Sequence, residues 1–349
     1  MMDFYLIKII FLSTLAFVFA ISWTPLLTNI LYKYKLGKQI RNSGSTPIFS
    51  ELHAHKAGTP TMGGVLMWGT LLVFILFFYV IGKIIPIDIL KNLNFLTQKE
   101  TFLPLGALIF SALIGLIDDW LDVRGKGMMG GGGLKMRHRL WLYTIIAVCG
   151  ALWFYFKLDW TVLHVPFLGN YEIGWWYIPI FILVIVATSF SVNETDGLDG
   201  LAGGTLLVSY VAYGIIAFSM GRYDLAAFCG VLMGAMLAFL WFNIAPARFY
   251  MGDTGSMSLG VTLGIIALLT NNIFILPFIG FVFVLESGSV IIQLLSKKFR
   301  HKKVFLSAPI HHHYQAIGWP ETKVVMRFWL IAAVMASVGL MIFLLDKNI

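Results

Sequence analysis

The chain has 349 residues and a net charge of +8, with 59% hydrophobic and only 12% charged residues. Soluble domains carry roughly 25% charged residues, so this composition excludes an ordinary soluble domain. The apolar runs lack the short alternating pattern of a membrane β-barrel. The predicted fold class is therefore all-α, a polytopic integral membrane protein.

Taken in chain order, about ten apolar runs are candidates for membrane-spanning helices, which need about 20 mostly apolar residues. They are 5–31, 65–85, 102–117, 140–156, 173–192, 201–220, 225–242, 257–270, 273–295 and 324–345. The runs 102–117 and 257–270 are short and would need flanking residues. The first run is too long for the apolar region of a signal peptide, which favours a retained helix. We expect a single transmembrane domain over residues 1–349.

Ten spans would place five loops on one side of the membrane, namely 32–64, 118–139, 193–200, 243–256 and 296–323. Together with Arg327, these loops hold 18 of the 25 Lys and Arg residues. Because Lys and Arg concentrate in cytoplasmic loops, we expect these five in the cytoplasm and both termini on the extracytoplasmic side. A basic face suits anionic lipid and phosphorylated substrates. Nothing resembles a base-reading module, so nucleic acid is not an expected partner.

The first two of these loops carry candidate phosphate and metal groups. Lys56 lies in HAHKAGTPTMGG (53–64), where Thr61 could cap the next helix or, with Lys56, face a phosphate. Asp118 and Asp119 end an apolar run, where the helix dipole disfavours anions. Mg²⁺ is commonly held by one or two carboxylates plus substrate phosphate. Basic residues that could hold phosphate oxygens follow at Lys126, Lys135, Arg137 and Arg139.

The next two loops are unusually acidic. SVNETDGLDG (191–200) has no Lys or Arg to neutralise its acidic side chains. Asp199 could be the N-cap of the following helix, but this explains one carboxylate only. Asp253, in MGDTGS (251–256), could likewise be an N-cap, or a third metal ligand that the fold brings near Asp118 and Asp119.

The fifth loop contains APIHHHYQAIGW (308–319) with three consecutive histidines. Zinc is conceivable, but adjacent side chains seldom reach one ion and no Cys lies nearby. Hydrogen bonding to phosphate or a nucleobase is at least as well supported. Glu286 falls inside an apolar run, where an ionisable residue suggests function by default. A bend at Gly288 with serine partners is the alternative.

Together these stretches resemble the phospho-N-acetylmuramoyl-pentapeptide transferase family. The resemblance spans about residues 50–330 and is most specific in the last of its motifs. The matching stretches are HxxKxGTPTMGG (53–64), the Asp118–Asp119 pair, NxTDGLDGLAGG (193–204), MGDTGS (251–256) and PIHHHYxxxGWPE (309–321). The wider polyprenyl-phosphate N-acetylhexosamine-1-phosphate transferase superfamily shares the aspartates, but usually lacks the His-Gly-Trp stretch.

The resemblance implies transfer of phospho-MurNAc-pentapeptide from UDP-MurNAc-pentapeptide to undecaprenyl phosphate, giving lipid I and UMP, with Mg²⁺. It also implies a bacterial cytoplasmic membrane location and a homodimer. Asp253 resembles the Mg²⁺ ligand, Asp118 the group that deprotonates or orients the lipid phosphate, and Asp119 a support for both; all three are candidate catalytic residues and metal ligands. The implied phosphate contacts are Lys56, Thr61 and Lys135. The implied uridine side comprises Asn193, Asp196, Gly197, Leu198, Asp199, Asn243 and Tyr250, and the catalytic candidates His311, His312 and His313 border the sugar or nucleotide.

Several alternatives stay open. The Gly- and Met-rich stretch 125–133 departs from the family pattern, which weakens the assignment of Lys135. The lipid phosphate could attack directly, or an aspartate could first form a phosphoryl-enzyme intermediate. We favour direct attack, because the acceptor already carries an oxyanion and needs only to be positioned. A sister transferase that uses UDP-N-acetylglucosamine is the nearest rival. A lipid or solute transporter is the rival from another class, although transporters place ionisable groups near the midplane rather than in loops.

Overall fold

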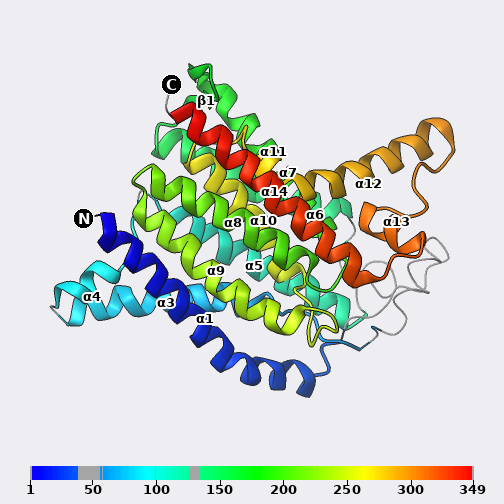
Figure 1. Ribbon diagram of the computed structural model, residues 1–349, viewed down its shortest axis with the longest axis horizontal. Coiled ribbons are helices and arrows are strands. Elements are labelled where there is room, and N and C mark those ends of the chain that lie inside the picture. The colour runs from blue at the N-terminus through cyan, green and yellow to red at the C-terminus, as the bar shows by residue number, and fades with distance from the viewer. Residues whose placement is uncertain are drawn as a thin grey trace.

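The computed structural model describes residues 2–37, 56, 58–85, 87–98, 100–125, 134 and 136–347. In these residues the protein is mostly helical (Figure 1). The long helices are α1 (Met2–Lys33), α3 (Val65–Ile84), α5 (Phe102–Val123), α6 (Met136–Lys157), α7 (Tyr177–Thr195), α8 (Leu201–Ser219), α9 (Tyr223–Asn243), α10 (Asp253–Leu269), α12 (Phe281–Arg300) and α14 (Glu321–Lys347). The short ones are α4 (Asp88–Leu93), η2 (Gly174–Trp176), α11 (Leu276–Ile279) and α13 (Ile310–Ala316).

Within the described residues, eight helices are long and apolar enough to cross a membrane: α1, α3, α5, α6, α7 together with η2, α8, α9 and α14. The prediction of an α-helical polytopic membrane protein is thereby confirmed. Two of the ten expected runs differ. The run 257–270 corresponds to α10, which has only 17 residues and ends at Leu269. The run 273–295 is divided between α11 and α12, because the chain leaves helical geometry at Gly280, with φ −97° and ψ 29°. Pro277 lies in the first turn of α11, where proline is tolerated.

Helix α10 lies at the centre of the bundle, and all its residues from Thr254 to Leu269 are buried. It packs against α5 and α7. Small residues permit this approach: a Cβ at Gly115 of α5 would clash with the backbone of Asp253, and one at Gly260 of α10 would crowd the backbone of α7 at Ser189. The close packing brings the C-terminal ends of α5 and α7 to the N-terminus of α10.

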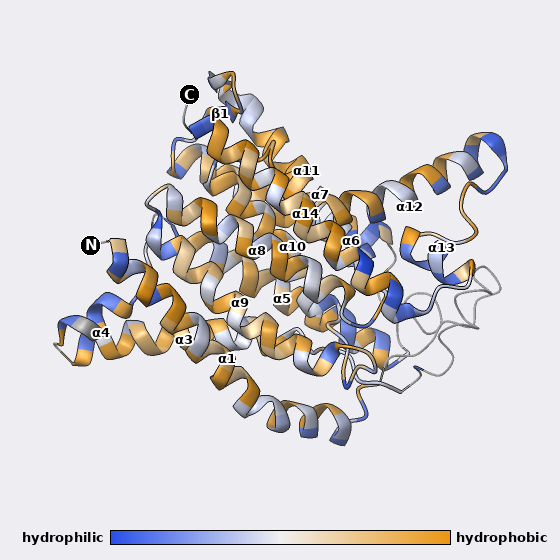
Figure 2. Ribbon diagram, in the orientation of Figure 1, coloured by the Kyte–Doolittle hydropathy of each residue, from blue (hydrophilic) through white to orange (hydrophobic). Residues whose placement is uncertain are grey.

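Hydrophilic residues gather at the two ends of the bundle, as the colouring of Figure 2 shows. At one end, α1 begins and α14 ends, and a small sheet of β1 (Val162–Val165) and β2 (Gly169–Glu172) pairs antiparallel with Val162 opposite Glu172. The sequence did not predict this hairpin. Nε2 of His164 lies 2.6 Å from a carboxylate oxygen of Asp346 and ties the hairpin to α14. At the other end lie α13 and the polar ends of α5, α6 and α7.

Candidate active site

Arg139, in the first turns of α6, joins three candidate residues from three other helices. Its Nε lies 2.8 Å from Oδ2 of Asp118 in α5, and its Nη2 lies 2.6 Å from Oδ2 of Asp253 in α10. Its Nη1 donates over 3.0 Å to Oδ1 of Asn193 in α7. Asn193 in turn donates to Oδ1 of Asp253 over 2.5 Å. The structure therefore places Asp118, Asn193 and Asp253 in one cluster around a guanidinium group.

Asp119 has a different environment from its neighbour. Its two carboxylate oxygens accept the backbone amides of Asp253 and Thr254, each over 3.0 Å. Thr61 also donates to Asp119 over 3.3 Å. These amides belong to the first turn of α10, which has no intrahelical acceptors for them and carries the positive end of the helix dipole. Asp119 thus caps a neighbouring helix and fixes α5 against α10.

The two helix boundaries at this cluster differ from the sequence expectation in detail. Asp118 and Asp119 are buried in the last two turns of α5, which continues to Val123 instead of ending before them. Asp253 is the first residue of α10 and follows Gly252, whose φ of 73° favours glycine. Because Asp119 accepts the amides of the first turn, the side chain of Asp253 is directed to Arg139 and Asn193 instead of capping its own helix.

Lys56 lies in a second cluster, which includes Asp199 of the TDGLDG stretch. Its Nζ is 2.7 Å from Oδ1 of Asp199 and 2.5 Å from Oε1 of Glu321. The same Glu321 oxygen accepts the Asp199 amide over 2.7 Å, and Oδ2 of Asp199 accepts the amide of Ala247 over 3.0 Å. Asp199 is therefore held by three segments of the chain, and the N-cap position of α8 belongs to Gly200, with φ of 83°.

Asn243 and Tyr250 border this second cluster. Asn243 accepts the amide of Gly200 over 2.9 Å and donates to the carbonyl of Phe249 over 2.9 Å. The hydroxyl of Tyr250 donates to the carbonyl of Lys56 over 3.4 Å. Burial raises the pKa of Tyr250 to about 12, so the hydroxyl stays protonated and remains a donor at neutral pH.

The three histidines are not equivalent. His311 and Glu286 are both fully buried, and His311 Nδ1 lies 2.8 Å from Oε2 of Glu286. The ring of His311 also lies against Gly197, where a Cβ would clash with it. Buried His312 has its Nδ1 2.9 Å from the side-chain oxygen of Gln315. The Nδ1 of half-buried His313 accepts the amide of Leu306 over 3.3 Å.

These contacts connect several candidates from distant motifs. Glu286, an intramembrane carboxylate in the sequence, is the partner of a histidine. Glu321 was not singled out by the sequence, although it closes the GWPE stretch and its place before an apolar run was the available signal. Arg139 was one of four basic residues in its loop and only the fold distinguishes it. Leu198 is buried, Asp196 follows α7, and Lys135 with the stretch 126–133 lies outside the described residues.

The residues of the Arg139 cluster fit a divalent cation. No group of three or more His, Cys, Asp or Glu side chains positioned for a metal ion is found in the described part of the chain. Two carboxylates, from Asp118 and Asp253, do converge on one cationic group. Mg²⁺ sites in phosphoryl-transfer enzymes commonly use one or two carboxylates and complete the shell with water and substrate phosphate. A two-carboxylate set therefore suits such an ion, with Asp119 engaged by α10.

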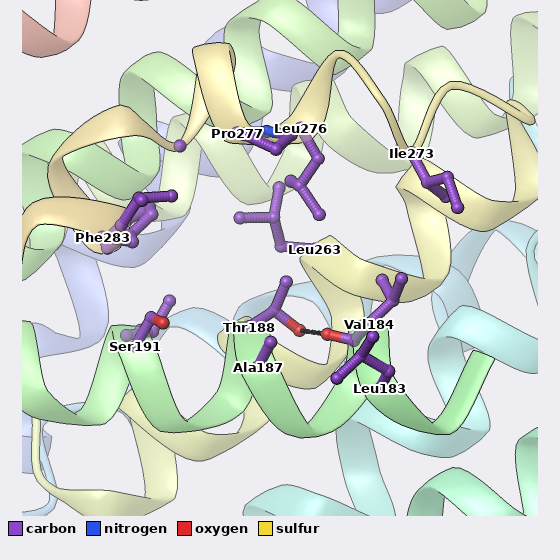
Figure 3. A pocket seen from close by; sticks show the side chains of 13 residues that line it. Leu183, Val184, Ala187, Thr188, Ser191, Leu263, Ile273, Leu276, Pro277 and Phe283 are labelled. Atoms are coloured by element: carbon purple, nitrogen blue, oxygen red, sulfur yellow. Dashed lines mark hydrogen bonds between the residues drawn. The ribbon is translucent and has the colours of Figure 1, made fainter. Parts of the chain in front are cut away.

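An apolar cavity of about 190 Å³ lies between α7, α10, α11 and α12. Figure 3 shows its lining, with Thr188 and Ala187 of α7 facing Leu263 of α10 and Pro277 of α11. At one end Ser191 lines the cavity, and its hydroxyl donates to Ser287 of α12 over 2.9 Å. Ser191 precedes Asn193 of the Arg139 cluster by two residues, so the cavity extends along α7 toward that cluster.

Two matches to known protein families indicate that the chain is a transferase. A family profile described as glycosyl transferase family 4 matches residues 101–271, the part of the chain from α5 to the loop after α10. The phospho-N-acetylmuramoyl-pentapeptide-transferase signature 1 matches residues 56–66, which include Lys56 and Thr61. Both matches fall on segments that build the two clusters.

Similar proteins from several bacteria identify the family more narrowly. Proteins named phospho-N-acetylmuramoyl-pentapeptide-transferase include one from Chloroflexus aggregans, 40% identical over 88% of this chain and 82% of the relative. One from a Geobacillus species is 37% identical over 94% and 95%, and one from Moorella thermoacetica is 38% identical over 90% and 92%. The chain belongs to the phospho-N-acetylmuramoyl-pentapeptide-transferase family.

Proposed function

We propose that the protein transfers phospho-MurNAc-pentapeptide from UDP-MurNAc-pentapeptide to undecaprenyl phosphate and releases UMP, the reaction that forms lipid I. The observation that carries this proposal is the convergence of Asp118, Asn193 and Asp253 on Arg139, at the end of the bundle where the family motifs meet. Family membership supports the same reaction.

The chemistry that these residues support is phosphoryl transfer between two anions. An oxygen of the lipid phosphate would attack the phosphorus that carries the sugar, and the bond from that phosphorus to the UMP oxygen would break. Asp118 and Asp253 would hold Mg²⁺, which when bound neutralises charge on the pyrophosphate and the departing UMP. We favour direct attack, because the acceptor already carries a competent oxyanion and needs only to be positioned.

The second cluster suits the nucleotide. Lys56, Asp199, Asn243 and Tyr250 offer a cation and several hydrogen-bonding groups. Gly197, two residues before Asp199, lies against His311 of α13. We assign them to the uridine diphosphate part of the donor, with Thr61 and Lys135 kept as candidates for phosphate contact and Asp196, Gly197 and Leu198 for the uridine side. His311, His312 and His313 would border the sugar or nucleotide.

The apolar cavity suits the lipid acceptor. It has almost entirely apolar walls and extends along α7 toward the Arg139 cluster, so it could receive part of a polyprenyl chain while the phosphate reaches the carboxylates. We place the clusters on the cytoplasmic side of a bacterial inner membrane, because the basic loops lie there. A homodimer and a single domain stay predictions from the sequence.

Release of UMP by purified protein tests the proposal. In detergent with undecaprenyl phosphate and Mg²⁺, we expect UMP from UDP-MurNAc-pentapeptide and none from UDP-N-acetylglucosamine. Asp253→Asn keeps the shape of the side chain and removes its charge, and we expect at least a roughly hundredfold loss of rate. UMP from the second nucleotide would instead indicate the sister transferase. No UMP from either substrate with folded wild-type protein would overturn the transferase assignment and favour a transporter.

A further inference from the structure

The contacts of Arg139 account for one oxygen of each carboxylate in the cluster. Oδ2 of Asp118 and Oδ2 of Asp253 both accept from its guanidinium group. The second oxygens have other donors: Oδ1 of Asp118 accepts the amide of Leu134 over 2.5 Å, and Oδ1 of Asp253 accepts from Asn193. The two Oδ2 atoms are thus the oxygens that face a common cation.

A metal ion that takes the place of the guanidinium between Asp118 and Asp253 would use the same two oxygens. The carboxylates repel each other, and both are only slightly exposed, with side-chain exposures of 4% and 16%. Leaving such a pair without a cation costs free energy, so one positive group has to be present in either state. A guanidinium fork matches carboxylates well, and Arg139 meets this requirement in the metal-free protein.

We propose that Arg139 is an exchangeable internal counter-ion of the metal site. It holds Asp118 and Asp253 together when no metal is bound, and it gives up at least one Oδ2 atom when the metal binds. This inference rests on the proposed function, because it takes those two carboxylates as the metal ligands. Arg139 acts here as a positioning residue for the site.

The exchange would couple metal binding to donor binding. The Arg139 side chain is 20% exposed, so its guanidinium has access to the mouth of the site. Once it has released a carboxylate, its free N–H donors can bind phosphate oxygens, for which arginine is well suited. Metal binding would thereby prepare a phosphate-binding group, and by linkage a bound phosphate would strengthen metal binding by the same factor.

Titration with Mn²⁺ in place of Mg²⁺ tests the exchange without catalysis. Electron paramagnetic resonance of free Mn²⁺, measured on the purified full chain in detergent at pH 8, gives the Kd and the number of sites. We compare wild type with Arg139→Gln, Asp253→Asn and Arg137→Gln. Arg137 is exposed on the same turn region of α6, so its substitution removes the same charge and reports long-range electrostatics only.

The expected result is that Arg139→Gln binds Mn²⁺ roughly tenfold more tightly than wild type, because hydrogen bonds to charged groups no longer have to be exchanged. Arg137→Gln should change the Kd much less. Equal effects of the two substitutions, or weaker binding in Arg139→Gln, would overturn the exchange. Asp253→Asn should abolish Mn²⁺ binding whether or not Arg139 exchanges. If this variant still binds Mn²⁺, the assignment of Asp253 as a metal ligand is wrong, and the exchange is not what has failed.

Thermal unfolding supplies a second measurement on the same proteins. Without metal, Arg139→Gln should unfold at a lower temperature than wild type, and Mn²⁺ should raise its Tm more than that of wild type. If Arg139→Gln does not fold, Arg139→Lys replaces it in the titration, since Lys keeps the charge but loses the fork. An Mn²⁺ affinity equal to wild type in Arg139→Lys would then overturn the proposal.

Discussion

Arg139 and Lys56 share one arrangement: each is a cation held by two carboxylates from other segments of the chain. Arg139 has Asp118 and Asp253, and Lys56 has Asp199 and Glu321, which begins α14. Buried ion pairs add little net stability, because desolvation offsets their attraction. Their clearer consequence is positional, since both cations are fixed at the clusters where we propose that the anionic donor binds.

Two substitutions at Glu321 distinguish two effects on substrate binding: holding the Lys56 side chain in place, and placing a negative charge beside it. Glu321→Ala removes one of the two acceptors of Lys56 and the acceptor of the Asp199 amide, so Asp199 alone remains to hold the Lys56 side chain. We expect the KM for the UDP-sugar to rise by roughly tenfold, which corresponds to one charge-assisted hydrogen bond. Steady-state UMP release at saturating lipid acceptor measures this.

Glu321→Gln is the matched control. It keeps an oxygen for the Asp199 amide and removes a negative charge from the vicinity of an anionic substrate. We therefore expect its KM for the UDP-sugar to stay at or below that of wild type. A similar rise in KM for both variants would show that the charge of Glu321, not its position, matters, and would contradict this reading.

The residues of the site differ in how far the sequence could indicate them. Asp118, Asp253 and Asp199 were conspicuous because carboxylates are scarce, at 17 Asp and Glu in 349 residues. Arg139 was not distinguishable from the other basic residues of its loop, because only the packing of α6 against the cluster selects it. Glu321 looked like an ordinary acidic residue in the first turn of a helix, and its contact with Lys56, 265 positions away, depends on tertiary structure.

At the scale of the elements, the site depends on how closely α5 approaches α10. Gly115 of α5 lies against the backbone of Asp253 and Thr254. Asp119, one turn further along α5, accepts the two amides of that same stretch. Packing and capping therefore fix the same pair of helices, and they set the separation between Asp118 and Asp253.

Gly115→Ala should disturb this pair. The new Cβ has no room, so α5 must move away from α10. Overpacking of this kind costs about 1–3 kcal/mol, and a displacement near 1 Å in an active site can reduce the rate by about a hundredfold. We expect a lower Tm and a large loss of UMP release.

The same helix supplies the control for that substitution. Gly106 has open space around its Cβ position, and Ala is the better helix former of the two. Gly106→Ala should leave activity unchanged and keep or slightly raise the Tm. If Gly115→Ala behaves in the same way, the approach of α5 to α10 does not set the geometry of the site.

The lengths of the apolar runs predicted most elements, but not their ends. The runs from 5 to 31 and from 324 to 345 lie within α1 and α14, since about 20 apolar residues define such helices without tertiary information. The run 102–117 stopped before the aspartates because they are charged, whereas α5 continues through them: Asp118 pairs with Arg139 and Asp119 with the first turn of α10. For the run 273–295 the sequence offered a bend at Gly288, whereas α12 continues through Gly288 and the interruption lies at Gly280.

At the scale of the whole molecule, α7 connects the apolar cavity with the Arg139 cluster, and the stretch that follows α7 leads to the second cluster. In α7, Ala187, Thr188 and Ser191 line the cavity, and Asn193 contacts Arg139 and Asp253. The next residues lead into the stretch that holds Asp199 beside Lys56. A polyprenyl phosphate with its chain in the cavity and a nucleotide at Lys56 would therefore approach the Arg139 cluster from two sides.

A substitution that fills the cavity tests whether the lipid and the nucleotide bind at these two different places. Ala187→Trp adds a large side chain on a wall of the cavity (Figure 3), and the overpacking cost of about 1–3 kcal/mol falls on whatever binds there. We expect the KM for undecaprenyl phosphate to rise roughly tenfold or more, with the KM for the UDP-sugar unchanged. Ala333→Trp on the exposed surface of α14 is the control for a bulky residue outside the cavity, and it should change neither. A rise in the nucleotide KM alone would mean that the cavity does not receive the lipid, and unchanged kinetics in both variants would mean that the chain of the acceptor lies elsewhere along the bundle.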